Sequence, residues 1–125
     1  MTTFSEQDLI YEVLSSMSRR DSGEAPSSDD YDECLRIAEA VVEQLVADRV
    51  VFIDDIDSID GSVFLPLARR VACDCVGKFG NSAMQSLLAN TRSSSVDSLQ
   101  AREEQTLKRI SSQWPTYRPI RAEFF

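Results

Sequence analysis

The chain has 125 residues, a net charge of −8 and an apolar fraction of 42%, a composition that suits one folded domain and argues against disorder of the whole chain. No apolar run approaches the roughly 18 residues that a membrane span needs, and the first residues lack the basic and apolar regions of a signal peptide. Histidine is absent, which removes histidine-based triads and most zinc sites.

The charge is divided unevenly along the chain. Residues 1–60 contain 16 Asp/Glu and 4 Lys/Arg, whereas residues 61–125 contain 5 Asp/Glu and 9 Lys/Arg. Such a division arises by chance among solvated faces, and it also suits a molecule whose acidic half meets the basic half of a neighbouring copy or whose two ends meet different partners. The overall acidity argues against tight, non-specific binding to duplex DNA.

Two amphipathic helices are predicted in the first half of the chain. Ser5 caps the first helix, which fades near Arg19. Its apolar face is Leu9, Ile10, Val13, Leu14 and Met17. After a polar connector broken by Gly23 and Pro26, Ser28 or Asp29 caps the second helix, which ends near Arg49. The core face of the second helix is Tyr31, Leu35, Ala38, Val42 and Leu45, with Ile37, Val41 and Val46 beside it.

A third helix, from Phe64 to Gly80, is the predicted centre of an all-α domain. Two apolar stripes lie on it side by side, so most of its circumference should be covered. The stripes are Phe64, Leu67, Val71, Cys75 and Phe79, and then Leu65, Ala68, Ala72 and Val76. Pro66 fits the first helical turn, and Gly80 fits the position after the end. The residues left to face water are Arg69, Arg70, Asp74 and Lys78.

The segments that flank the central helix are less regular. Residues 50–53 are β-branched or aromatic, but no second strand is evident, so an extended connector is predicted. Residues 81–89 predict a short helix. Residues 91–95 interrupt the helical pattern without a strong helix breaker. A longer helix from Val96 to Trp114 carries only a thin apolar stripe: Val96, Leu99, Leu107, Ile110 and Trp114. A helix with so small an apolar face usually packs on another molecule or projects from the body of the domain. We therefore divide this single domain into a helical core, 1–95, and a projecting helix with an extended docking tail, 96–125.

The cysteines and the acidic loop are the remaining candidates for metal chemistry. Cys73 and Cys75 point to opposite sides of a helix and cannot share a metal or a disulfide, so buried thiols are predicted. Four aspartates precede Gly61: Asp54, Asp55, Asp57 and Asp60. Their spacing resembles a calcium loop, but Pro66 stands where the bidentate glutamate belongs. The loop is therefore a solvated acidic loop, a weak cation site or an acidic contact surface, and we predict no metal, cofactor or catalytic residue.

The C-terminal segment carries the residue types that dominate binding hot spots. They are Trp114, Tyr117, Arg118, Arg121, Phe124 and Phe125. Pro115 and Pro119 keep this segment extended. Two terminal phenylalanines exposed to water would be a liability, so they either fold back onto this domain or dock onto a neighbouring subunit or partner.

The order of these segments resembles that of the head-to-tail adaptor (tail accessory or head-completion) proteins of tailed bacteriophages. The resemblance rests on FSEQDLIYEVLSSM, GEAPSSDDYDECL and LPLARRVACDCVGKFG, followed by an Ala/Glu/Leu-rich helix and a short extended tail. The acidic DDIDSID loop and the shortness of the tail depart from that pattern.

The resemblance implies a non-enzymatic virion structural protein of the neck, assembled in the host cytoplasm as a ring of about twelve copies below the portal. It implies that residues 114–125 reach the portal and that the helix 96–114 packs on a ring neighbour or the portal. The acidic loop would line the DNA channel, where DNA passes without specific binding, or face a tail component such as a nozzle, hub or fibre. Alternatives are an acidic helical module that masks a basic partner, and a carboxylate-based glycosidase.

Overall fold

The structure is a computed structural model of the chain and describes residues 3–18, 27–53 and 55–112. The described part is mainly helical, with only two very short strands, which confirms the predicted all-α class. Its elements are β1 (Thr3–Phe4), α1 (Glu6–Ser16), α2 (Ser28–Ala47), β2 (Ile59–Asp60), α3 (Gly61–Phe79), α4 (Asn81–Thr91) and α5 (Val96–Ser112).

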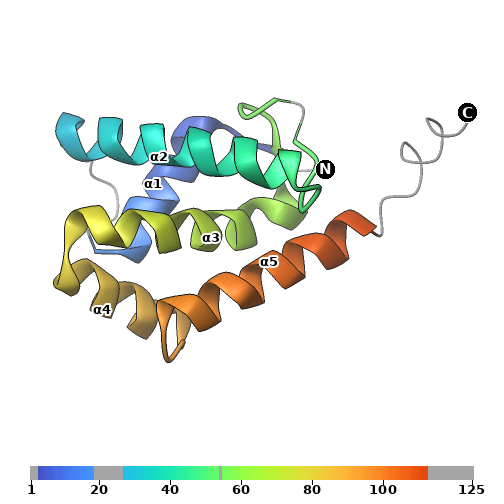
Figure 1. The fold of residues 1–125 in the computed structure, drawn as a ribbon. Helices are drawn as coiled ribbons and strands as arrows, with labels where there is room; N and C mark the ends of the chain where they lie inside the picture. The colour runs from blue at the N-terminus through green and yellow to red at the C-terminus, as the bar shows by residue number, and fades with distance from the viewer. Residues whose placement is uncertain (1–2, 19–26, 54, 113–125) are drawn as a thin grey trace, which may run out of the picture.

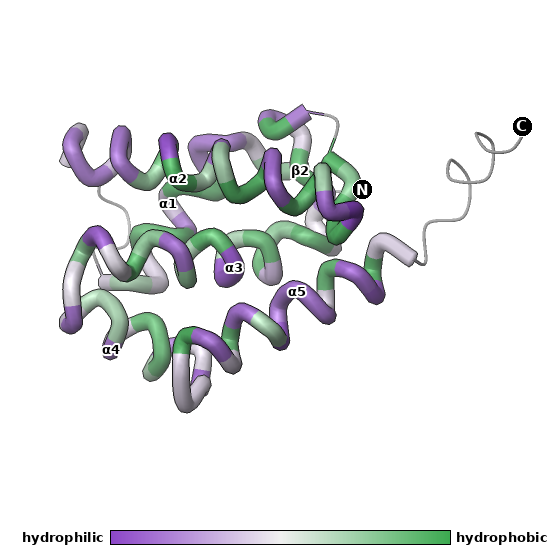
Figure 2. Tube along the Cα trace, in the orientation of Figure 1, coloured by the Kyte–Doolittle hydropathy of each residue, from purple (hydrophilic) through white to green (hydrophobic). Residues whose placement is uncertain are grey.

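Helix α3 is the centre of the bundle, as the sequence predicts. It contacts each of the other four helices. Figure 1 shows α2, α3 and α5 as three successive layers, with α3 between the other two. The hydrophobic segments turn toward one another in this arrangement, and the hydrophilic segments lie mainly along the outside (Figure 2).

Helix α1 forms as the sequence predicts. Ser5 caps it and exchanges hydrogen bonds with Asp8, because the Ser5 hydroxyl accepts from the Asp8 amide and the Asp8 carboxylate accepts from the Ser5 amide. The whole predicted apolar face, Leu9, Ile10, Val13, Leu14 and Met17, is at most 1% exposed. This stripe binds α1 to both α2 and α3.

Helix α2 differs slightly from its prediction. Its cap is Ser27, whose hydroxyl accepts a hydrogen bond from the Asp30 amide, one residue before the predicted cap. Cys34 joins the buried face, whereas Val46 is 37% exposed and was wrongly placed beside the core. Residues 51–53 follow as a connector that belongs to no described helix or strand, in agreement with the prediction.

The two short strands were not predicted. Thr3 and Phe4 pair antiparallel with Asp60 and Ile59. The Phe4 ring then stacks on Phe64, with ring centroids 4.1 Å apart. A two-residue strand is too short to show an alternating pattern, so only its partner reveals it.

Helix α3 begins three residues earlier than predicted, at Gly61. Pro66 therefore lies inside the helix and not in its first turn, which corrects the prediction. Because proline has no N–H, the carbonyl of Ser62 lacks its usual helical donor at this point. The end is as predicted: Gly80 has a φ of 94°, a conformation that glycine adopts without strain, and it joins α3 directly to α4.

Helix α5 is the main correction to the fold. It does not project: it lies along α3, with Leu99 and Leu107 fully buried. Glu103 and Ser111 are buried on the same side, so every fourth residue from 99 to 111 faces inward. The stripe looked thin in the sequence because two of its four members are polar. Within the described residues, α5 therefore packs as part of the helical core, and the predicted division after residue 95 does not hold there.

Candidate interaction surfaces

The predicted tail site lies outside the described residues. This concerns Trp114, Tyr117, Arg118, Pro119, Arg121, Phe124 and Phe125. The structure does define the point from which that segment continues. The Ser111 hydroxyl donates a hydrogen bond of 3.2 Å to the Val50 carbonyl, which fixes the end of α5 against the connector after α2. The last turn of α5 is thus attached to the body of the bundle.

The acidic loop is organised by local hydrogen bonds. Asp54 lies outside the described residues, and Asp55 and Asp57 are exposed. The Asp55 carboxylate accepts a hydrogen bond of 3.0 Å from the Asp57 amide, and the Asp57 carboxylate accepts one of 3.3 Å from the Glu6 amide. Asp60 accepts from the Ser62 hydroxyl at 2.7 Å. Asp57 therefore places a negative charge at the N-terminus of α1, where the helix dipole favours it.

A second acidic group, absent from the sequence analysis, lies beside this loop. The pKa of Glu6 is raised to about 7, first by partial burial, then by a hydrogen bond and charge repulsion from Glu39, and then by the charge of Asp57. The Glu6 Oε2 atom is buried and has no hydrogen-bond partner. Since residues 6, 39 and 57 come from three different segments, only the folded chain brings them together. Negative charge is therefore crowded around Glu39, in the middle of α2.

The seam between α3 and α5 is polar at its centre. Arg70, predicted to face water, is 8% exposed and lies between two helices. Its Nε donates to Glu104 at 2.6 Å and its guanidinium donates to Asp74 at 2.8 Å. Burial acts to lower the pKa of Arg70, but the hydrogen bonds that it donates to Asp74 and Glu104, together with the negative charges of both, outweigh burial and raise the pKa. The guanidinium is a charged link between α3 and α5.

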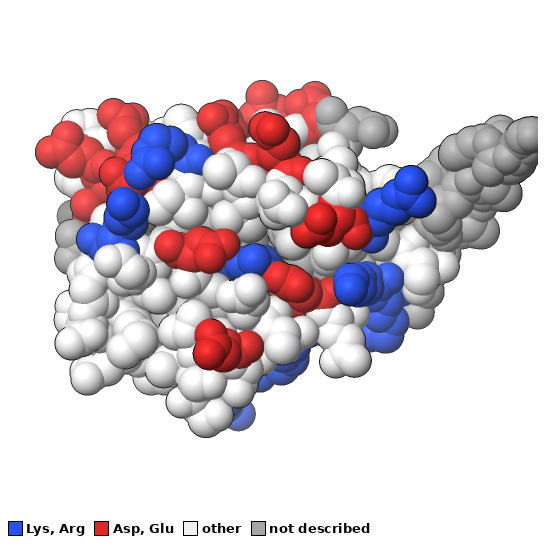
Figure 3. Space-filling model, in the orientation of Figure 1, with Lys and Arg blue, Asp and Glu red and all other residues white. Residues whose placement is uncertain are grey.

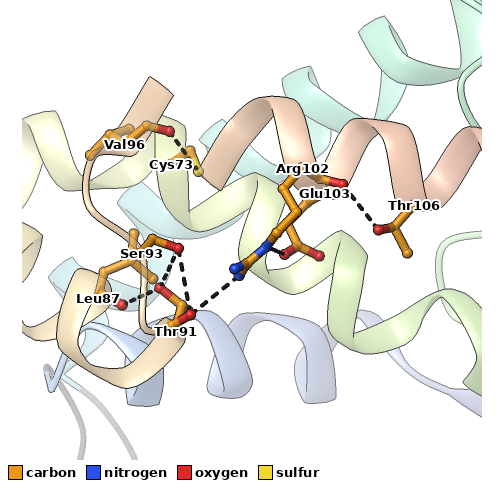
Figure 4. Close-up of polar contacts among 8 residues, drawn as sticks. All are labelled: Cys73, Leu87, Thr91, Ser93, Val96, Arg102, Glu103 and Thr106. Atoms are coloured by element: carbon orange, nitrogen blue, oxygen red, sulfur yellow. Dashed lines mark hydrogen bonds and ion pairs between the residues drawn. The ribbon is translucent and has the colours of Figure 1, made fainter. Parts of the chain in front are cut away.

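The corner between α4 and α5 is fixed by a second arginine (Figure 4). Arg102 donates to the Thr91 carbonyl at 3.3 Å and to the buried Glu103 carboxylate at 3.0 Å. The Cys73 thiol points at the Val96 carbonyl, 3.9 Å away, and burial raises the pKa of this thiol to about 12. These contacts hold α5 at its angle to α4, and none of them marks a reactive group.

The cysteines are buried, as predicted. Cys75 turns away from Cys73 and toward α2, where its sulfur lies 3.8 Å from the sulfur of Cys34. The contact with Cys34 and then burial raise the pKa of Cys75, which keeps the thiol protonated.

The outward faces of the two outer layers differ in charge: α2 is acidic, and α5 is basic after its first turn, in which Asp97 is also exposed. Helices α1 and α2 together hold nine carboxylates and one arginine. Asp32, Glu39 and Glu43 are exposed on α2. On α5 the exposed charged groups after its first turn are Arg102, Lys108 and Arg109, which line a shallow hollow with Gln105, Thr106 and Ser112. In Figure 3 acidic side chains gather along the top, over α2, with one basic group among them, whereas acidic and basic side chains are mixed lower down, toward α5.

Comparison of the chain with protein-family models, characterised proteins and solved structures gave no match. Within the described residues, no three His, Cys, Asp or Glu side chains are grouped so that they could hold a metal ion. No described helix combines the length and the hydrophobicity needed to cross a bilayer.

Proposed function

We propose that this chain is a head-to-tail adaptor of a tailed bacteriophage: a structural protein that forms a ring below the portal, closes the filled head and supports the tail. The sequence resemblance is the source of this assignment. The observation that carries it physically is the attachment of α5. Because Ser111 is bonded to Val50 and α5 packs along α3, the C-terminal segment starts from a fixed point on a folded body.

Residues 113–125 are thirteen residues long and would reach at most about 45 Å if fully extended. In the proposed function this segment docks onto the portal through its aromatic and arginine side chains. Helix α5 cannot offer its leucine stripe to a neighbour, since α3 already covers it. Only its outward, basic face is available for a ring or portal contact.

The proposed function gives the acidic loop two alternative roles. Asp55 and Asp57 are exposed, so their charge could line a channel and repel DNA, or it could meet a tail component. The tail component would be a nozzle, hub or fibre protein in the neck of the virion.

The test removes residues 113–125 and measures co-sedimentation with the portal protein encoded in the same genome. We expect a loss of affinity of at least about a hundredfold, since the deletion removes every hot-spot candidate of the tail. A full-length variant with Trp114, Phe124 and Phe125 replaced by serine is the matched control for chain length, and it should lose most of the same affinity. Unchanged binding of both variants would contradict tail docking.

A second candidate function is an acidic helical module that masks a basic partner. The nine carboxylates of α1 and α2 favour it. Such a module would bind its partner as a monomer or dimer with an affinity that falls steeply with salt. An adaptor should instead be present in many copies in purified particles.

A further inference from the structure

We propose that two copies of this chain associate front to back, with the basic outward face of α5 in one copy lying against the acidic outward face of α2 in the next. The acidic face is defined by Asp32, Glu39 and Glu43, and the basic face by Arg102, Lys108 and Arg109. The inference rests on the proposed function for the identity of the partner as a second copy, and it names the surfaces that would meet.

The placement of the two faces is the first argument. Helix α3 lies between α2 and α5, so the sides of α2 and α5 that point away from α3 look in opposite directions (Figure 1). One copy therefore cannot satisfy its acidic face with its own basic face. Unlike surfaces on opposite sides of one body produce a heterologous contact, which repeats from copy to copy and closes into a ring when the rotation allows it.

The spacing of the charges is the second argument. Asp32 and Glu39 are seven residues apart, and so are Arg102 and Arg109. Seven residues are about two helical turns, or about 10 Å of rise, in both helices. Two helices laid side by side can therefore bring both pairs of opposite charges together at once.

The crowding of carboxylates on the acidic side is the third argument. Glu39 lies against Glu6, and Asp57 adds a further negative charge. A cation supplied by a second copy would relieve this repulsion. On the other side, no ion pair of Lys108 or Arg109 with another described residue is present. Arg102 does pair with Glu103, but its side chain is 48% exposed and still presents charge on the outward face.

The experiment uses two full-length variants that reverse one face each. The acidic-face variant carries Glu39→Lys and Glu43→Lys, and the basic-face variant carries Lys108→Glu and Arg109→Glu. All four positions are exposed. Sedimentation equilibrium at low salt should show association of the unaltered chain, and each variant alone should associate at least about tenfold more weakly, because like charges then face each other.

Mixing the two variants is the decisive step. In the mixture the unaltered acidic face of one variant meets the unaltered basic face of the other, and the two reversed faces also complement each other. We therefore expect the mixture to associate as the unaltered chain does. The control carries Lys78→Glu and Arg92→Glu, which change the net charge as the basic-face variant does but lie outside α5, and it should associate normally. Circular dichroism checks that every variant is folded.

Three results would overturn the inference: an unaltered chain that stays monomeric at low salt and high concentration, folded variants that associate as the unaltered chain does, or a mixture that does not recover. Portal co-sedimentation of the unaltered chain, measured in the same buffer, tests the proposed function separately. Portal binding without association between copies contradicts only this inference, whereas association that responds to charge reversal without portal binding contradicts only the adaptor function.

Discussion

Helices α1 and α5 both pack on α3, but they do so by different means. Helix α1 buries an unbroken apolar face, from Leu9 to Met17, against α2 and α3. Helix α5 buries two leucines alternating with Glu103 and Ser111, and its seam with α3 contains the charged side chain of Arg70. The α1 side is therefore held by the hydrophobic effect, which needs no particular partner geometry, whereas the α5 side needs specific hydrogen bonds to compensate buried polar groups.

The largest effect should come from the apolar side. Leu14→Ala removes a fully buried side chain from α1, and we expect the free energy of unfolding to fall by about 2–5 kcal/mol because a cavity remains. Equilibrium unfolding in urea measures this change in the free energy of unfolding. The control is Leu65→Ala on α3, where the side chain is 45% exposed, and it should change stability by less than about 1 kcal/mol. Equal losses for the two variants would contradict the apolar account of the α1 side.

The polar side should respond less strongly. Arg70→Met leaves the carboxylates of Asp74 and Glu104 without their cation, but their side chains are 42% and 30% exposed and can turn to water. We therefore expect a loss of about 2 kcal/mol, below the loss found when a fully buried pair is broken. Arg69→Met, at the neighbouring position on α3, is the matched control and should cost less than half as much. A neutral or stabilising Arg70→Met would show that packing alone holds α5.

The smallest effect concerns the polar end of α1, because Glu6 is only partly buried and solvent screens much of its charge. The pKa of Glu6 in the folded chain, about 7, lies above its ordinary value of 4.5. Its contribution to stability is therefore fully present below pH 4.5 and is lost as the pH rises through 7. Glu6→Gln should remove this part of the pH dependence, so the variant should gain stability relative to the unaltered chain between pH 4 and pH 8. Thermal unfolding across that range, with Glu12→Gln as the control in the same helix, measures it, and parallel curves would refute the prediction.

The parts of the fold that depend on neighbours along the chain could be predicted from the amino-acid sequence. The Ser5 cap, the apolar face of α1, most of the covered circumference of α3 and the glycine that ends it were predicted, because capping and helical periodicity act over a few residues. Leu65, predicted to lie in a covered stripe of α3, is 45% exposed and corrects that part of the prediction. Four features became visible only in the folded chain: the burial of Arg70, the packing of α5 on α3, the pairing of β1 with β2 and the proximity of Glu6 to Glu39. Each of these depends on groups that are distant in the sequence, so a polar residue could be recognised as a core residue only when its partner across the bundle was in place.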